Sequence, residues 1–365
     1  MKRYTPKILI KYLIKEFAFS LLIFTLIFSS LIILTTFVEE LIFFKEKQIN
    51  NNFFLKIFIL TLIKSPTLIF NFSPFIFLFS GIFFYVKFLK NNEISPMSLS
   101  GFSLNFITLV PAIFSFFLGI VIIAVLTPVT SQLSKYYESV KQKYSDNDNL
   151  LIMSNTGIWI KENKGMEKLI IRADRNTEEN FSKLKNITIY IFNNELFKER
   201  IASEQATIKD NEWHLHNVNI TSETSVRNLK NYIYTSAINL EKLKSYFSNS
   251  DIYSIWNINS QLEEIRDRGY YGQELIIKLN KQLSLPFLLF SMIIISTLFT
   301  IKVNYSFNNF IYIFLGILIG IVVYFINDLS IALGESGKIP LILSVWMPVI
   351  LLMIYSTYSL IRSYD

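Results

Sequence analysis

Long uncharged runs of apolar residues dominate the chain, and one long polar insertion separates them into two groups. A helix that crosses a membrane needs about 20 consecutive apolar residues, because hydrocarbon offers its backbone no hydrogen-bonding partner. Six segments meet this requirement, three before the insertion and three after it. They are residues 17–38, 65–86, 104–126, 282–301, 310–327 and 339–361. The pattern predicts an α-helical membrane protein with six transmembrane helices in a three-plus-three arrangement.

The insertion follows a different pattern. Its middle contains short runs of alternating apolar and polar residues bounded by turn residues, which is typical of antiparallel strands with one buried face. These features predict an inserted all-β domain over about 146–240, with a sandwich or jelly-roll fold. The predicted strands are 157–161, 168–173, 187–192, 201–209 and 212–220.

The predicted domain organisation has three parts. The first transmembrane half covers residues 1–128, the insertion 129–281 and the second transmembrane half 282–365. Helical segments are expected on both sides of the β-domain, at 131–143 and 259–268. Ser260 is the predicted N-cap of the second segment, because a Glu three residues later completes a capping box.

Composition and charge refine this prediction into a topology. Hydrophobic residues make up 52% of the 365 positions and charged residues 17%, whereas a soluble domain carries about 25% charged residues. With a cytoplasmic amino terminus, the cytoplasmic segments hold nine Lys or Arg and three acidic residues, and the short outer loops hold five of each. Since positive residues accumulate in cytoplasmic loops, both termini are predicted to be cytoplasmic and the insertion to lie outside. The net charge of +7 is therefore a topology signal and not a nucleic-acid-binding surface.

Candidate catalytic chemistry is sparse. The chain has no Cys, which excludes disulfides, thiolate metal sites and thiol nucleophiles. His214 and His216 share one face of a predicted strand, but zinc needs three or four ligands and nothing nearby completes a site, so no metal is predicted. Residues 334–338 resemble part of a phosphate-binding loop, yet Ile339 replaces the Ser or Thr that would hold magnesium. The chain is expected to be neither an enzyme nor a cofactor-binding protein.

Ionisable residues are also sparse within the predicted spans. Lys64 and Asp328 come close to them, each at an outer end. Such residues at depth normally mark ion or proton pathways, so proton-coupled transport is disfavoured. Lys64 is expected to extend to the membrane interface. If ATP drives the protein, another chain must hydrolyse it.

The predicted cytoplasmic loop at residues 87–102 mixes charged and apolar residues and is too short for a domain. One interpretation is a connector that Lys87 and Lys90 hold at the membrane interface. The other is a short coupling helix that docks into a cytoplasmic motor, with Glu93 as its charged contact. An acid in a loop that is otherwise basic slightly favours the second interpretation.

Several short stretches add a further signal through their order and spacing. They are Lys11–Phe17, Phe37–Glu39, Glu93 with Met97 and Ser100–Phe102, Thr127–Pro128, Gly157–Lys161, Ile189–Asn193, Leu285–Pro286 and Asn327–Asp328. Together with the predicted topology, they resemble the lipopolysaccharide-export permeases of the LptF/LptG type, and more closely the G-type subunit. The architectural resemblance extends over essentially the whole chain.

This resemblance implies a membrane subunit of an ABC transporter. With an F-type permease and a cytoplasmic ATPase dimer, it would extract lipopolysaccharide from the bacterial inner membrane. The outer domain would be a periplasmic β-jelly roll that passes the lipid to a bridge of membrane-anchored periplasmic proteins. ATP would be used by the partner ATPase.

The same resemblance assigns roles to the residues of the loop. Glu93 takes the place of the family's coupling acid, with Met97, Ser100 and Gly101 in the same motif. The family often has an Arg two residues before the acid, where this chain has Asn91. Part of the expected charge pattern is therefore missing.

The resemblance also suggests a contact to the lipid headgroup. Family members carry Lys residues at the outer end of the first span, which are thought to meet lipid phosphates. Here Thr36, Ile42 and Phe43 occupy that region, and Lys45 and Lys47 follow slightly later. Either these two lysines substitute, or the headgroup is recognised differently.

Two hypotheses from other classes remain open. The chain could be a permease of another ABC type that acts on lipoproteins or peptides, in which case no F-type partner is expected. It could also be a membrane-anchored sensor or scaffold whose β-domain binds proteins, and it would then purify without an ATPase. The identity of the partners discriminates between these hypotheses.

Overall fold

The computed structural model describes most of the chain as two compact units. The described residues are 6–45, 53–144, 150–154, 157–164, 167–174, 183–193, 196–209, 211–222, 225–236, 250–267, 272–302 and 309–362. The helical unit consists of Met1–Ser139, Asp251–Trp256 and Ile277–Asp365, and the sheet unit of Val140–Ser250 and Asn257–Ile276.

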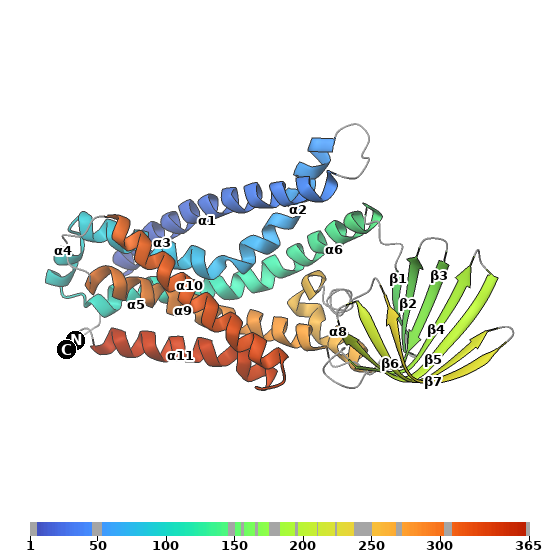
Figure 1. Cartoon of the computed structure of the whole chain (residues 1–365). Coiled ribbons are helices and arrows are strands. Elements are labelled where there is room, and N and C mark those ends of the chain that lie inside the picture. Colours follow the sequence, from blue (N-terminus) through green and yellow to red (C-terminus); the bar gives the residue numbers. More distant parts are fainter. Residues whose placement is uncertain are drawn as a thin grey trace. The chain divides into compact units, whose positions relative to one another are not determined.

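Helices account for nearly all of the helical unit (Figure 1). The first group is α1 (Lys7–Phe44), α2 (Phe53–Asn71), α3 (Ser73–Lys90), α4 (Ile94–Leu99), α5 (Leu104–Val121), the π-helix η1 (Ile122–Leu126) and α6 (Thr127–Tyr144). The second group is the short η2 (Ser250–Ile252), α9 (Gln273–Lys302), α10 (Asn309–Glu335) and α11 (Leu341–Arg362). Most of α8 (Ile255–Asp267) belongs to the sheet unit. Among the described residues, seven helices are long and apolar enough to cross a membrane.

The difference between six predicted spans and seven apolar helices arises in the second predicted span. Residues 65–86 extend over the end of α2 and most of α3, and the chain bends at Phe72 (φ −84°, ψ 0°). Pro74 has no N–H and so cannot continue the hydrogen-bond ladder to the preceding turn. The bend does not reverse the chain, because the amide of Phe72 still donates to Leu68 and that of Ile76 to Phe72.

Helix α1 shows how α2 and α3 belong together, because it packs along both of them. The paired residues run in opposite directions from one end of α1 to the other. These pairs are Glu16 with Lys87, Phe24 with Phe79, and Glu39 with Lys64. We conclude that α2 and α3 form one bent return along α1, so that the seven helices make six passages.

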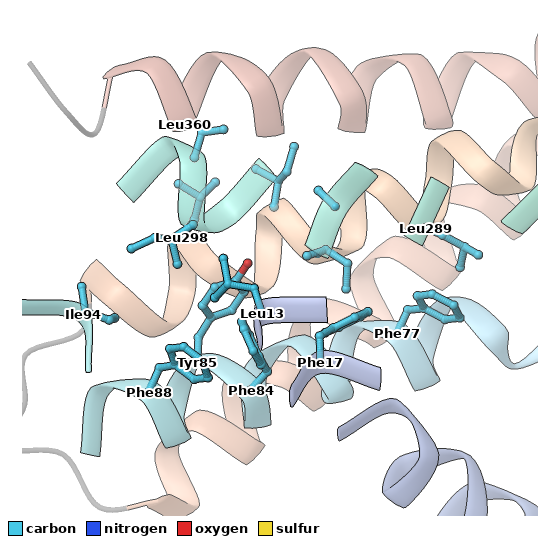
Figure 2. Close-up of a cluster of buried hydrophobic side chains, with 14 of the residues drawn as sticks. Leu13, Phe17, Phe77, Phe84, Tyr85, Phe88, Ile94, Leu289, Leu298 and Leu360 are labelled. Carbon is cyan, nitrogen blue, oxygen red and sulfur yellow. The ribbon is translucent and has the colours of Figure 1, made fainter. Parts of the chain in front are cut away.

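A cluster of buried apolar side chains joins the helices at the end where α4 lies. Figure 2 shows Leu13 and Phe17 of α1 among the aromatic rings of α3, with Leu289 of α9 nearby. Ile94 of α4 and Leu360 of α11 belong to the same cluster. Tyr12, near the beginning of α1, donates to Glu93 next to α4, and Figure 1 shows α11 ending where α4 lies. The beginning of α1 and the end of α11 therefore lie at the same end of the helical unit, as an even number of passages requires.

The sheet unit contains seven described strands that pair in chain order as one antiparallel sheet (Figure 1). They are β1 (Leu150–Ser154), β2 (Gly157–Lys164), β3 (Glu167–Ala173), β4 (Lys183–Asn193), β5 (Leu196–Lys209), β6 (Glu212–Ser222) and β7 (Val226–Thr235). All five predicted strands are present as β2 to β6, and the prediction of an inserted all-β domain is confirmed. The described strands form a single sheet. A jelly roll or sandwich, as predicted, would divide its strands between two sheets.

Alternation buries one face of this sheet. In β6, Trp213 and Leu215 are buried, while His216 points outward and is exposed. The same period places Ile187, Ile189 and Ile191 of β4 in the core. The prediction from the sequence pattern holds here because side chains on successive strand residues point to opposite faces.

The helix expected at 259–268 begins earlier than the capping box indicates. Helix α8 starts at Ile255, so Ser260 lies inside it and donates its hydroxyl to the carbonyl of Asn257 (3.0 Å). The prediction of Ser260 as N-cap was therefore wrong. Ile258 and Leu262 are buried and lie one turn apart on one face of α8, and this burial outweighs the local capping signal.

Candidate functional site: the loop between α3 and α5

Two tight helix ends shape the loop that the sequence singles out. At the end of α3, Asn92 adopts φ +53°, Glu93 donates its amide to Phe88 and Asn92 donates to Leu89. At the end of α4, Gly101 adopts φ +85°, Phe102 donates to Met97 and Gly101 to Ser98. Both ends are Schellman motifs, which close a helix with a residue in the left-handed region. Asn and Gly are the residues that tolerate this conformation best.

Glu93 occupies the short connection between α3 and α4, and both of its carboxylate oxygens accept hydrogen bonds. The hydroxyl of Tyr12, on α1, donates to Oε2 at 2.8 Å. The side-chain amide of Asn91 donates to Oε1 at 2.9 Å. Asn91, which stands where the resemblance expects an Arg, therefore supplies a neutral donor to the carboxylate.

Helix α4 has an inner and an outer side. On the inner side, Ile94 is buried in the apolar cluster shared with α1 and α3, and Met97 is half-buried against it. On the outer side, Leu99 is 90% exposed, and Ser100 and Gly101 are exposed as well. The site predicted from the sequence therefore divides into Met97, which supports the loop, and residues that face outward.

A second contact fixes the same end of α1 to α3. The ammonium group of Lys87 lies 2.6 Å from Oε2 of Glu16. Glu16 follows Tyr12 by one turn of α1, so these residues lie on one face of that helix. The loop is consequently held on α1 by Tyr12 and Glu16 together.

Other candidates from the sequence lie apart from this loop. Lys45 is exposed and forms the C-cap of α1, and Lys47 is outside the described residues. Residues 334–338 form a turn in which Lys338 donates its amide to Leu333 and Gly337 donates to Gly334. This helix-ending turn agrees with the prediction that the segment is not a phosphate-binding loop.

The two histidines of β6 have separate partners. A ring nitrogen of His216 lies 2.8 Å from Oδ1 of Asn231, and His214 lies 3.7 Å from Oε2 of Glu212. Within the described part of the chain, no three His, Cys, Asp or Glu side chains gather as a metal site would require.

Sequence reasoning missed two residues of this site. Tyr12 is 81 positions from Glu93, and nothing in the sequence pairs them. Leu99 had a weak signal, since it is an apolar residue between two serines in a loop that the prediction places in water.

An oriented carboxylate thus stands before α4, and an exposed leucine stands at its end. The apolar side chain would be buried by a partner, and the acid would pair with a basic residue on it. The long apolar helices and the inserted sheet define a multi-pass membrane protein.

Comparison with known proteins identifies the family. Residues 11–362 match the family described as "Lipopolysaccharide export system permease LptF/LptG". The chain therefore belongs to this family: it is a permease subunit of a lipopolysaccharide export system and is not itself catalytic. None of the curated proteins matches the chain. Membership of the family decides against the lipoprotein permease and the sensor or scaffold as functions.

Proposed function

We propose that the chain is the G-type permease subunit and that it couples ATP hydrolysis in a partner subunit to lipopolysaccharide extraction. The observation that carries this proposal is the loop at Glu93, in which an oriented carboxylate precedes α4 and the exposed Leu99 ends it. A transport subunit that hydrolyses nothing itself needs such a surface to receive mechanical work. The G-type assignment rests on the resemblance of the sequence.

The proposed energy source follows from the chemistry of the helices. Coupling to an ion gradient needs ionisable groups along a path through the membrane. In the described helices, the charged groups Glu16, Lys87, Glu40 and Lys64 pair with one another near the two ends of the α1–α2–α3 layer. We propose that ATP is used by a cytoplasmic ABC ATPase dimer and that this chain binds no cofactor.

The proposed orientation places the loop at Glu93 in the cytoplasm of a bacterium. It rests on the excess of Lys and Arg in the segments at that end of the spans, which are retained inside during insertion. Both termini are then cytoplasmic, the protein lies in the inner membrane, and the sheet unit is periplasmic.

The proposed partners divide between the two sides of the membrane. On the cytoplasmic side, the loop would dock on the ATPase dimer. Within the membrane, an F-type permease would complete the cavity that accepts the acyl chains. On the periplasmic side, the sheet unit would pass lipopolysaccharide to membrane-anchored bridge proteins.

The coupling role is tested by replacing Glu93 and Leu99 separately with Ala. Each substitution is expected to weaken binding of the ATPase by about tenfold or more, because residues at the centre of an interface dominate its energy. Co-purification and ATP turnover of the complex are the measurements. Ser98→Ala is the matched control, since Ser98 is exposed on the same helix. Full binding and transport in the Glu93→Ala variant would contradict the proposal.

Lys45 and Lys47 are proposed as contacts to the lipid phosphates. Lysines near the headgroup level attract phosphate oxygens, and Lys45 is exposed at the end of α1. Site-specific crosslinking to lipopolysaccharide in a Lys45→Ala, Lys47→Ala variant tests this role. Crosslinking as efficient as in the parent protein would show that these charges are only solvated.

A further inference from the structure

We infer that Tyr12 is a positioning residue for Glu93, and that the first turns of α1 are thereby part of the surface that receives the ATPase. This inference rests on the proposed function of the loop and goes beyond it, because it adds an element 81 positions away in the sequence. Tyr12 touches neither nucleotide nor lipid in this assignment. It acts through the carboxylate of Glu93.

Two hydrogen bonds define the direction of the Glu93 carboxylate. A Glu side chain at a surface has several accessible rotamers, and only some of them present the charge outward in a fixed direction. Here one oxygen accepts from the Tyr12 hydroxyl at 2.8 Å and the other from the Asn91 amide at 2.9 Å. Asn91 belongs to the same tight turn, so Tyr12 is the donor that ties the carboxylate to a separate helix.

Tyr12 is itself held in place by its neighbours. Its ring lies 5.9 Å from that of Phe88, the residue of α3 to which the amide of Glu93 donates. The next residue, Leu13, is fully buried in the cluster that also contains Phe88 and Ile94. The ring of Tyr12 therefore rests against α3, and the buried neighbour Leu13 anchors the backbone at this position.

An ion pair one turn further along α1 provides a second connection between α1 and α3. Glu16 lies 2.6 Å from the ammonium group of Lys87 on α3. With Tyr12 it forms two polar links, at positions i and i+4, between α1 and the chain around the loop. A force on Glu93 is accordingly transmitted to α1, which continues without interruption to Phe44.

The experiment compares Tyr12→Phe in the parent and in the Glu93→Ala background. The substitution removes the hydroxyl and keeps the ring against Phe88, so the thermal midpoint of the purified permease complex is expected to stay unchanged. Binding of the purified ATPase to that complex, measured as Kd, is expected to weaken about three- to tenfold, as for one charge-assisted hydrogen bond. In the Glu93→Ala background, Tyr12→Phe is expected to have no further effect.

Two controls make the result specific to the hydroxyl. Tyr358→Phe is the matched substitution, because Tyr358 is exposed on α11 near Leu360 of the same cluster; it is expected to leave Kd unchanged. Incorporation of 4-aminophenylalanine at position 12 restores a donor at the same ring position and is expected to restore Kd.

The outcomes separate this inference from the proposed function. If Glu93→Ala weakens binding and Tyr12→Phe does not, the role of Tyr12 is overturned and the coupling role of Glu93 stands. If neither substitution has an effect, both are overturned. An equal loss from Tyr12→Phe in both backgrounds, or a loss that 4-aminophenylalanine does not restore, would show that Tyr12 acts independently of Glu93 and would also overturn the inference.

Discussion

Glu40 is a buried carboxylate near the end of α1, whereas Glu93 contacts Tyr12 near the beginning of that helix. Its side chain is 1% exposed, whereas that of the neighbouring Glu39 is 64% exposed. The hydroxyl of Tyr137, on α6, donates to Glu40 at 2.5 Å, and the ammonium group of Lys64, on α2, lies 3.6 Å away. A carboxylate away from water is stable only when it is paired in this way. Lys64, expected from the sequence to reach the membrane interface, pairs with Glu39 and Glu40.

We predict that Tyr137→Phe destabilises the helical unit. The substitution removes a donor from a buried carboxylate, which lowers the free energy of unfolding by about 1–3 kcal/mol. Thermal unfolding in detergent measures this change. Glu39→Gln is the control, because an exposed ion pair contributes about 0–1 kcal/mol, and its midpoint should stay close to that of the parent. Equal midpoints for Tyr137→Phe and the parent would contradict the prediction.

We predict a similar loss for Gly81→Ala, for a steric reason. Gly81 lies on α3 where this helix approaches α9, and an added Cβ would lie 2.9 Å from Cβ of Ser296. Real Cβ atoms essentially never approach this closely, so α3 must shift. Overpacking of this kind costs about 1–3 kcal/mol, which thermal unfolding in detergent will show. Ser98→Ala, on the exposed face of α4, serves as the unchanged reference.

At the scale of elements, three neighbouring strands of the sheet each contain one residue that is outside the regular strand pairing. Asn186, Glu204 and Asn217 lie on β4, β5 and β6, and none of them appears in the register of paired residues. Asn186 and Asn217 adopt φ +47° and +54°, and the Asn217 amide donates to Glu204 at 2.9 Å. The alternation shifts here by one residue, since Leu184 and Ile187 are both buried.

We predict that Asn217→Val destabilises the sheet unit more than Asn217→Gly. Both lose the hydrogen bond to Glu204, but a β-branched residue at positive φ costs about 1–2 kcal/mol more than Gly. Asn219→Val is the control, because Asn219 pairs regularly with Ala202 and Val favours strands. The temperature at which the sheet unit becomes sensitive to a protease measures the difference. A Val variant as resistant as the Gly variant would refute a backbone requirement at position 217.

At the scale of the whole molecule, the chain passes six times along the helical unit. Helix α1 therefore begins, and α11 ends, at the end where α4 lies. Leu13, Ile94 and Leu360 share one cluster there, and the Lys and Arg excess of the sequence is concentrated at the same end of the spans. Topology from packing and topology from charge thus agree in placing the loop and both termini together.

We predict that the loop and the sheet unit lie on opposite sides of the membrane. The chain has no Cys, so a single introduced Cys reports its own location. In cells with a permeabilised outer membrane, Ser225→Cys, near the beginning of β7, is expected to react with a membrane-impermeant maleimide. Ser98→Cys is expected to react only after the inner membrane is opened. Equal labelling of both variants in closed cells would contradict the proposed orientation.

The sequence by itself determined the long apolar helices and five of the seven described strands, β2 to β6. Both follow from local patterns, namely uncharged apolar runs and alternation with period two, and each pattern has one physical cause. It also singled out Glu93 as a candidate, because an acid in an otherwise basic loop is visible without a structure. The bend at Phe72 was not predicted, because spanning helices often contain Pro without dividing.

The tertiary structure alone decided which residues meet. Tyr12 reaches Glu93, and Tyr137 reaches Glu40 across 97 positions, and contacts this distant leave no periodic trace in a single sequence. It also decided that Met97 faces the core and Leu99 faces outward, because a helix as short as α4 has no hydrophobic period to read. The physical reason is the same throughout: local patterns fix the backbone of an element, whereas burial and pairing depend on the element packed against it.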